Sequence, residues 1–147
     1  MKRLITLTIV LAVPILVAAT LAASRNAAAR TAPTTIHVVV KMTSANRAAG
    51  GRLGLIAGNV LAPSGGKIGR YQGECFQVTN NTNNCTFTLA LPAGHIAFIG
   101  AYGPGFSANA NARSPIAGGT NAYRNDRGEV DEHETGNTVQ LTIHLSR

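Results

Sequence analysis

The sequence predicts an all-β fold, an eight-stranded antiparallel up-and-down β-barrel that follows a cleaved N-terminal signal helix. Three observations support this prediction. Apolar and polar residues alternate with a period of two, segments rich in Gly, Pro and Asn separate the alternating stretches, and the number of these stretches is even. An even number of hairpin-linked strands favours closure, because a closed barrel leaves no sheet edge exposed.

The N-terminal segment has the layout of a secretory signal peptide. Lys2 and Arg3 precede a nearly apolar run, and small residues follow at positions 27–29. We expect cleavage after Ala29, with a cut after Ser24 as the alternative, and cleavage after Ala29 leaves residues 30–147 as one domain. An uncleaved membrane anchor is the alternative, because the apolar run is long enough to cross a bilayer. With cleavage, we expect a protein secreted to the extracellular space or the cell envelope, with no membrane attachment.

The alternating stretches define the expected strands. The C-terminal stretch has the clearest period, because its four aliphatic residues all fall on odd positions from 139 to 145. Pro- and Gly-rich segments at 63–66 and 92–94 mark two of the turns. Alternation alone does not fix which face of each strand looks inward. The expected strands cover residues 36–42, 53–61, 68–78, 85–91, 96–102, 113–117, 122–132 and 137–145.

The two cysteines predict a disulfide inside one hairpin. Cys75 and Cys85 flank a segment of Thr and Asn at 79–84, which is typical of a turn. A hairpin centred on Asn80 places the cysteines directly opposite each other, within bridging distance. A bridge of this kind stabilises a fold by about 2–3 kcal/mol. A redox pair is the alternative, but the Cys-x-x-Cys spacing is absent.

Charge and motif content exclude several function classes. The net charge is +7, yet the basic residues are scattered, so the sequence disfavours nucleic-acid binding. Phosphate-binding loops and Gly-x-Ser-x-Gly elbows are absent from the sequence. Glu129, Asp131 and His133 share one face of an expected strand, but their spacing matches no recognised metal site. We therefore expect no metal and no cofactor.

Glycines punctuate the segment 116–130 at positions where a strand would not need them. Gly118 and Gly119 predict a tight corner, through positive φ or a close backbone approach, and Thr120 is placed to hydrogen-bond locally. Gly128 lies inside the following expected strand and predicts a bulge or a barrel kink.

This segment, Ile-Ala-Gly-Gly-Thr-Asn-Ala-Tyr-Arg-Asn-Asp-Arg-Gly-Glu-Val, resembles the glycine signature of the dirigent and allene oxide cyclase barrel-like proteins. Segments 58–59, 66–70 and 91–96 and the two-cysteine hairpin are similar to those of secreted bacterial members. The resemblance implies an eight-stranded barrel that holds a small, largely apolar molecule, and it also allows a homo-oligomer. In dirigent proteins the molecule is a phenoxy radical pair oriented for coupling. In the cyclases it is an unstable epoxide folded for ring closure.

The acidic site residues of both families are not evident, since residues 36–42 contain neither Asp nor Glu. The remaining candidates are side chains that could line a barrel or hydrogen-bond a ligand. A solvated charge, a packed aromatic ring or a surface histidine is the simpler alternative for each of them. The candidate ligand-binding residues are His37, Tyr71, Tyr102, Arg113, Tyr123 and Arg127.

Two functions remain open at the level of the sequence. The first is a secreted barrel that binds a small hydrophobic or phenolic compound and steers its cyclisation or coupling by orientation and exclusion of water. The second is a non-catalytic exported barrel that acts as a binding or structural module of the cell envelope. A buried polar cluster with Arg113 and Tyr123 pointing into an open lumen would favour the first function, and a lumen filled with packed side chains would favour the second.

Overall fold

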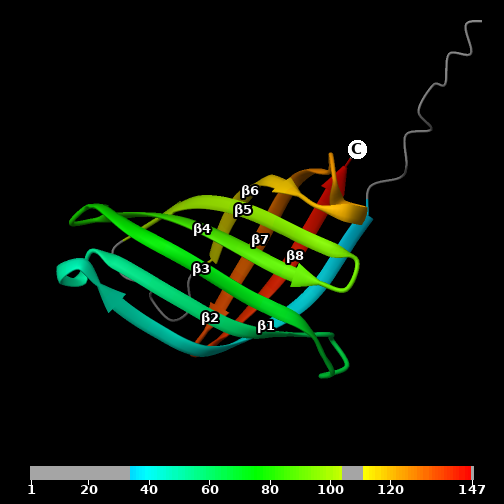
Figure 1. Cartoon of the computed structure of the whole chain (residues 1–147), viewed down its shortest axis with the longest axis horizontal. Helices are drawn as coiled ribbons and strands as arrows, with labels where there is room; N and C mark the ends of the chain where they lie inside the picture. Colours follow the sequence, from blue (N-terminus) through cyan, green and yellow to red (C-terminus); the bar gives the residue numbers. More distant parts are fainter. Residues whose placement is uncertain (1–33, 104–110, 147) are drawn as a thin grey trace, which may run out of the picture.

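The computed structural model describes residues 34–103 and 111–146. These residues form eight antiparallel strands whose neighbours pair in chain order, and β1 pairs with β8 to close the barrel (Figure 1). The predicted all-β, eight-stranded barrel is therefore confirmed. The strands are β1 (Thr34–Ala48), β2 (Leu53–Leu61), β3 (Lys67–Thr79), β4 (Thr82–Leu91), β5 (Gly94–Tyr102), β6 (Asn111–Gly119), β7 (Arg127–Thr135) and β8 (Thr138–Ser146).

The predicted signal peptide, residues 1–29, lies outside the described residues. Within the two described stretches, no helix is long and apolar enough to cross a bilayer.

The inward face of each strand carries the core. On β8 the alternation predicted from the sequence places Val139, Leu141, Ile143 and Leu145 inside. On β7 the inward face instead combines an apolar residue with an acid, since Val130 and Glu132 are both buried. The buried apolar residues are Val38, Val40, Ile56, Val60, Tyr71, Cys75, Cys85, Phe87, Leu89, Ile96, Phe98, Ile116, Val130, Val139, Leu141, Ile143 and Leu145.

The segment predicted as a strand at 122–132 is a strand only from Arg127 onward. A short 3₁₀ turn, η2 (Asn121–Tyr123), comes first. Asn121 and Asn125 have φ of 53° and 72°, the left-handed region that Asn tolerates better than most residues. Local turn geometry therefore overrides the apparent continuity of the strand.

The glycine corner works by close approach. Gly119 leaves no room for a Cβ because the backbone of Tyr123 lies against it, whereas a Cβ at Gly118 would meet nothing within 4 Å. The Thr120 carbonyl accepts a local hydrogen bond from the Tyr123 N–H (3.0 Å). Its hydroxyl accepts one from the backbone N–H of His95 on β5 (3.0 Å), so Thr120 joins the corner to the β4–β5 hairpin.

Gly128 has a φ of 135°, and the His144 carbonyl lies where its Cβ would be. The pairing of β7 with β8 runs through Gly128 without a register shift. Of the bulge or kink predicted here, the bulge is therefore absent, and glycine is required for positive φ and for a close approach of the two backbones.

The predicted disulfide is present. Cys75 and Cys85 are paired in register across β3 and β4, with their Cα atoms 4.0 Å apart, and both side chains are buried inside the barrel. Thr79 ends β3 and Thr82 begins β4, so the turn is shorter than the predicted segment 79–84.

The seam between β5 and β6 is the least paired part of the barrel wall. Backbone pairing there covers only Ile96↔Gly119, Ala97↔Gly118 and Phe98↔Ile116, with a register shift. Beyond Phe98 the described residues of these two strands continue without backbone pairing to each other. Side chains must therefore hold this part of the wall together.

Candidate functional site

The middle of the barrel is filled by aromatic rings. The Phe87 ring stacks on Tyr71 (centroids 5.3 Å apart), packs at a tilt on Phe98 (5.3 Å) and meets Tyr102 edge-on (5.7 Å). The Phe87 ring also lies over Gly73 of β3, where a Cβ would collide with it. This packing fills the middle of the lumen with side chains.

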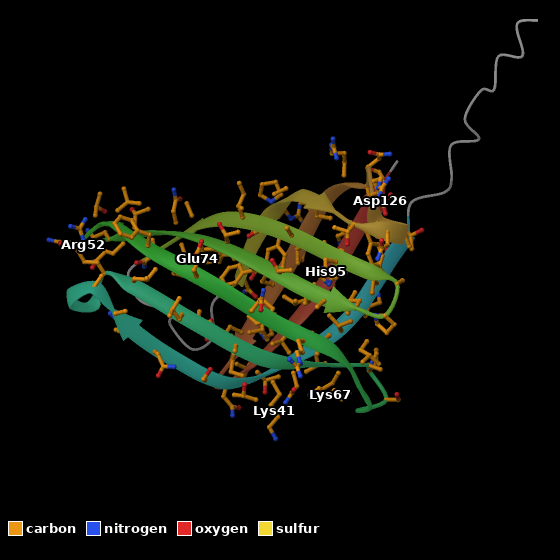
Figure 2. The ribbon with its side chains drawn as sticks, viewed as in Figure 1. Lys41, Arg52, Lys67, Glu74, His95 and Asp126 are labelled. Carbon is orange, nitrogen blue, oxygen red and sulfur yellow. A yellow bond between two sulfur atoms is a disulfide. The ribbon has the colours of Figure 1, made fainter. Side chains whose placement is uncertain are left out.

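One end of the barrel opens into a cavity of about 410 Å³, which we call the mouth cavity. It is bounded by the C-terminal part of β1, the start of β2 and the turns between β3 and β4 and between β7 and β8. Arg52 lies at this end of the molecule, and Asp126 lies at the opposite end (Figure 2). The lining residues are Met42, Ala45, Asn46, Arg47, Gly51, Arg52, Gly54, Leu55, Ile56, Cys75, Gln77, Asn80, Asn83, Glu134, Gly136 and Asn137.

The chemistry of the mouth cavity changes from its floor to its rim. Met42, Ile56 and the disulfide half Cys75 are apolar, whereas five side-chain amides contribute donors and acceptors. Arg47 and Arg52 supply positive charge, and Glu134 supplies one carboxyl. The volume and this mixture are typical of a site for a small organic molecule.

A buried polar cluster lies beside the mouth cavity, where the backbone pairing of β5 and β6 has ended. The hydroxyls of Tyr102 and Ser114 lie 2.6 and 2.7 Å from Oε1 of Glu132 and 2.8 Å from each other. Ser114 is 1% exposed and Glu132 8% exposed. The cluster joins β5, β6 and β7 by side chains, and so it holds the seam together.

Gly100 makes room for this cluster. A Cβ at Gly100 would lie 2.6 Å from the Ser114 Oγ and 3.0 Å from the Tyr102 hydroxyl. Tyr102 pairs in register with Asn83, which lines the mouth cavity. On β7, Glu132 is two residues from Glu134, the carboxyl that lines the cavity.

Burial dominates the electrostatics of the interior. Desolvation raises the pKa of Glu132, against the opposing effect of hydrogen bonds from Tyr102 and Ser114. Desolvation and the nearby charge of Glu132 raise the pKa of Glu134. The pKa of Tyr102 is raised by burial and by Glu132, and that of Tyr71 by burial and by Glu132, Tyr102 and Glu134. The interior groups therefore favour their protonated, neutral forms.

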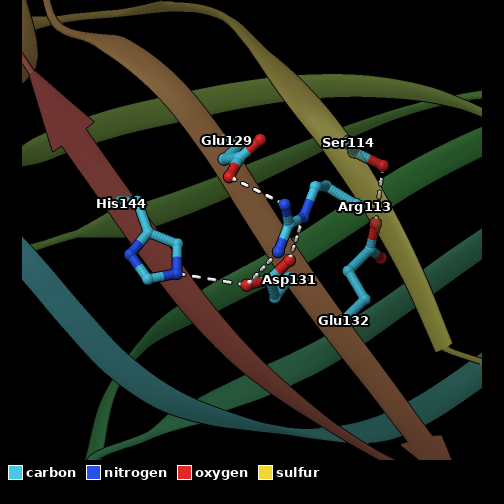
Figure 3. A network of polar contacts seen from close by, with 6 residues as sticks. All are labelled: Arg113, Ser114, Glu129, Asp131, Glu132 and His144. Atoms are coloured by element: carbon cyan, nitrogen blue, oxygen red, sulfur yellow. Dashed lines mark hydrogen bonds and ion pairs between the residues drawn. The ribbon is translucent and has the colours of Figure 1, made fainter.

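Arg113, a predicted ligand-binding residue, lies on the outer wall. Figure 3 shows its guanidinium between Glu129 and Asp131, with Nη1 3.2 Å from Glu129 and Nε 2.6 Å from Asp131. Asp131 also contacts Nε2 of His144 at 3.1 Å. Hydrogen bonds from Arg113 and His144 lower the pKa of Asp131, while Asp131 raises that of Arg113. Arg113 thus points outward and does not line the barrel interior.

His37 and Arg127 are also exposed. The His37 Nδ1 lies 3.3 Å from the Thr142 hydroxyl on the outer wall, and Arg127 donates to the Asp126 carbonyl at 3.2 Å. Tyr123 is partly buried in η2 at the end opposite the mouth cavity, where burial and Asp126 raise its pKa. Of the six predicted residues, only Tyr71 and Tyr102 lie in the interior beside the acids.

Glu132 and Ser114 were not among the site residues predicted from the sequence. The signal for Glu132 was its parity with Val130, which places it on the inward face of β7, opposite to Glu129 and Asp131. Glu129, Asp131 and His133 lie on the other face of β7, which looks outward. Among the described residues, no three His, Cys, Asp or Glu side chains are grouped so as to hold a metal ion.

Comparison with known proteins locates this architecture among solved folds. No protein-family model matches the chain, and no curated protein does. Among solved structures, it is similar to a pyocyanin demethylase, with a TM-score of 0.65, 23% identity, and coverage of 76% of this chain and 99% of that one. A pterocarpan synthase dirigent protein gives a TM-score of 0.63 at 15% identity, over 80% of this chain and 97% of that one. The fold is that of a dirigent-like barrel.

A third similar structure is AbnU, described as an exo-specific intermolecular Diels-Alderase. Its TM-score is 0.61 at 14% identity, and the match covers 79% of this chain and 99% of that one. At such identities the likeness establishes the dirigent-like barrel as a fold, and the site must be argued from the side chains of this chain.

Proposed function

We propose that this barrel binds a small hydrophobic or phenolic molecule in its mouth cavity and steers the cyclisation or coupling of that molecule. The observation that carries the proposal is the cavity of about 410 Å³, which has an apolar floor and an amide-rich rim. An apolar floor takes up the ring system, and the amides orient the oxygen atoms of the ligand. Orientation in a site that excludes water accelerates ring closure without a strong acid or base.

The similar solved structures support the proposal that this barrel binds a small molecule. The similar barrels are described as a demethylase of pyocyanin, a pterocarpan synthase and a Diels-Alderase, so this architecture accommodates small organic molecules in other proteins. Membership of the allene oxide cyclase barrel-like family is part of our proposal. It rests on the glycine corner and the cysteine hairpin, both of which have structural roles in the barrel.

Export from the cell is also part of the proposal. The buried disulfide fits an oxidising compartment, and the N-terminal layout fits a signal peptide. N-terminal sequencing of the protein recovered from the medium or the envelope tests it, with residue 30 expected as the first residue.

The second candidate is a non-catalytic exported binding or structural module. The packed aromatic rings around Phe87 favour it, because they fill the lumen at mid-height and leave only one end open. Both candidate functions use the mouth cavity as the binding site, but only the first converts the bound ligand into a product.

Binding is tested with 2-naphthol, a small fluorescent phenol, in equilibrium dialysis against the mature protein. A Gly54→Phe variant should abolish binding, because a Cβ at Gly54 makes only ordinary contact with Cys75 (3.8 Å) and the added ring would occupy the cavity. Thr86→Phe, on the exposed outer face of β4, is the matched control and should bind as the wild type does. Equal binding by both variants would place the ligand elsewhere and refute the mouth cavity as its site.

A further inference from the structure

The two oxygens of the Glu132 carboxyl have different surroundings. Both hydroxyl contacts, from Tyr102 and from Ser114, are made to Oε1, and Oε2 has no hydrogen-bond partner in the described part of the chain. No side-chain polar atom described in the structure is both fully buried and unpaired. Oε2 is therefore not fully buried, and Glu134, which lies on the same face of β7, lines the mouth cavity.

The contacts around Oε1 outnumber the hydroxyl hydrogen atoms that are available to them. Three oxygens, those of Tyr102, Ser114 and Glu132, lie within 2.6–2.8 Å of one another and form three contacts. The two hydroxyls bring only two hydrogen atoms, and a carboxylate brings none. Because both hydroxyls donate to Oε1, the 2.8 Å contact between them has no hydrogen atom of its own. A proton that binds this carboxyl is therefore left to Oε2.

The groups that face Glu132 are known for each neighbouring element. Tyr102 comes from β5, Ser114 from β6, Glu134 from β7 and Tyr71 from β3, while the β8 residue opposite it is Leu141. None of these groups is a cation. Proton transfer to or from Glu132 thus changes the charge of the site without an opposing basic residue, and burial raises the pKa of Glu132 and so favours its neutral form.

We propose that Glu132 is the acid and base of this barrel, and that its Oε2 exchanges a proton with an enol, a phenol or an enolisable ketone bound in the adjoining mouth cavity. This proposal rests on the binding function proposed above and names a residue and a reaction class for it. Tyr102 and Ser114 act as positioning residues that fix the carboxyl through Oε1.

The step balances within the ligand and the protein. Oε2 takes a proton from a C–H beside the carbonyl, the C–H bond breaks, and its electron pair forms the enolate. The proton then returns to carbon or to oxygen, so the product is a tautomer of the ligand. The reaction consumes no oxidant, reductant or second substrate.

The test uses 2-tetralone, an enolisable bicyclic ketone, with the mature protein in D₂O. Proton NMR follows the exchange of the C1 hydrogens, and equilibrium dialysis measures binding of the same compound. We expect the wild type to accelerate exchange and Glu132→Gln to lose about 100-fold of that acceleration while binding is retained. Gln keeps the shape and the oxygen that accepts from Tyr102 and Ser114, so the fold should persist.

Two further variants separate the roles. Glu74→Gln removes an exposed carboxyl from β3 and should leave exchange unchanged. Glu132→Asp, which keeps a carboxyl on a shorter side chain, should retain part of the activity and its pH profile. If 2-tetralone binds and Glu132→Gln exchanges it as fast as the wild type, the role of Glu132 is refuted and the binding function stands. If neither 2-tetralone nor 2-naphthol binds, both proposals fail.

Discussion

At the scale of residues, the interior acid Glu132 has the most unusual environment. Its neighbours are hydroxyls, aromatic rings and a second carboxyl, and burial outweighs the hydrogen bonds that favour its charged form. The exposed acid Asp131, one residue away, faces outward and has its pKa lowered by Arg113 and His144. Two adjacent acids on one strand therefore have opposite pKa shifts, because the pleat places them on opposite sides of the wall.

This contrast predicts a pH dependence of stability. A pKa that is higher in the folded state than the unfolded value of 4.5 means that folding favours protonated Glu132, so its contribution is full below pH 4.5 and is lost as pH rises through the folded-state pKa. Glu132→Gln removes this loss. The free energy of unfolding of the variant relative to the wild type should therefore increase between pH 4 and pH 8.

Urea unfolding of both proteins across this range measures the difference. Asp131 contributes in the opposite direction, since its lowered pKa stabilises the fold above its unfolded value of 3.8, but it is present in both proteins and cancels. A difference that stays constant with pH would show that Glu132 is ionised equally in the folded and unfolded states.

A second residue-scale prediction concerns Gly100. Gly100→Ala should destabilise the barrel by about 1–3 kcal/mol, because the added methyl would press on the Ser114 and Tyr102 hydroxyls. Gly118→Ala is the matched control, with open space around its Cβ and no positive φ, and should change stability by less than about 1 kcal/mol. Chemical unfolding measures both variants. Equal losses of stability in the two variants would mean that the polar cluster accommodates the added methyl group without destabilising the fold.

At the scale of elements, β7 shows what the sequence could and could not predict. The strand and its alternation were evident from the sequence. The apolar residue Val130 indicated which face of the strand points inward. The sequence could not show that Tyr102 and Ser114, from two other strands, would meet Glu132, because these contacts depend on the register of β5, β6 and β7. It also offered Arg113 as a candidate beside the simpler alternative of a solvated charge, and the outward partners of Arg113 on β7 are set by the same register.

The β3–β4 hairpin was predicted more completely. Its cysteines are close in sequence and the turn residues fix the register, so the local sequence contains most of the information. We expect the Cys75→Ala, Cys85→Ala double variant to lose about 2–3 kcal/mol of stability relative to the oxidised wild type. Denaturant unfolding measures this, and reductant should lower the midpoint of the wild type alone. An unchanged midpoint would mean that the bridge does not stabilise the barrel.

At the scale of the whole molecule, the two ends of the barrel differ. One end contains η2, with Tyr123 packed against the core and Thr120 bonded to β5. The other end contains the mouth cavity, beside the part of the β5–β6 seam that lacks backbone pairing. The packed rings between them separate the ends, so a ligand in the mouth cavity enters and leaves on the same side.

The incomplete seam predicts where the wall opens first. Amides of residues 99–102 that face β6 should exchange with solvent faster than the amides shared by β1 and β8, whose pairing extends from Thr34↔Leu145 to Lys41↔Thr138. Hydrogen exchange followed by NMR gives the rates residue by residue. Uniform protection around the barrel would show that the Tyr102–Ser114–Glu132 cluster seals the seam as firmly as backbone pairing does.

The polar cluster has an optical consequence as well. The chain contains no tryptophan and three tyrosines, two of which, Tyr71 and Tyr102, lie in the interior beside Glu132. Two of the three tyrosine rings that absorb in the near ultraviolet therefore border the polar cluster. Ligand arrival or proton movement at Glu132 should change their absorbance, so the native protein reports on this site without a label.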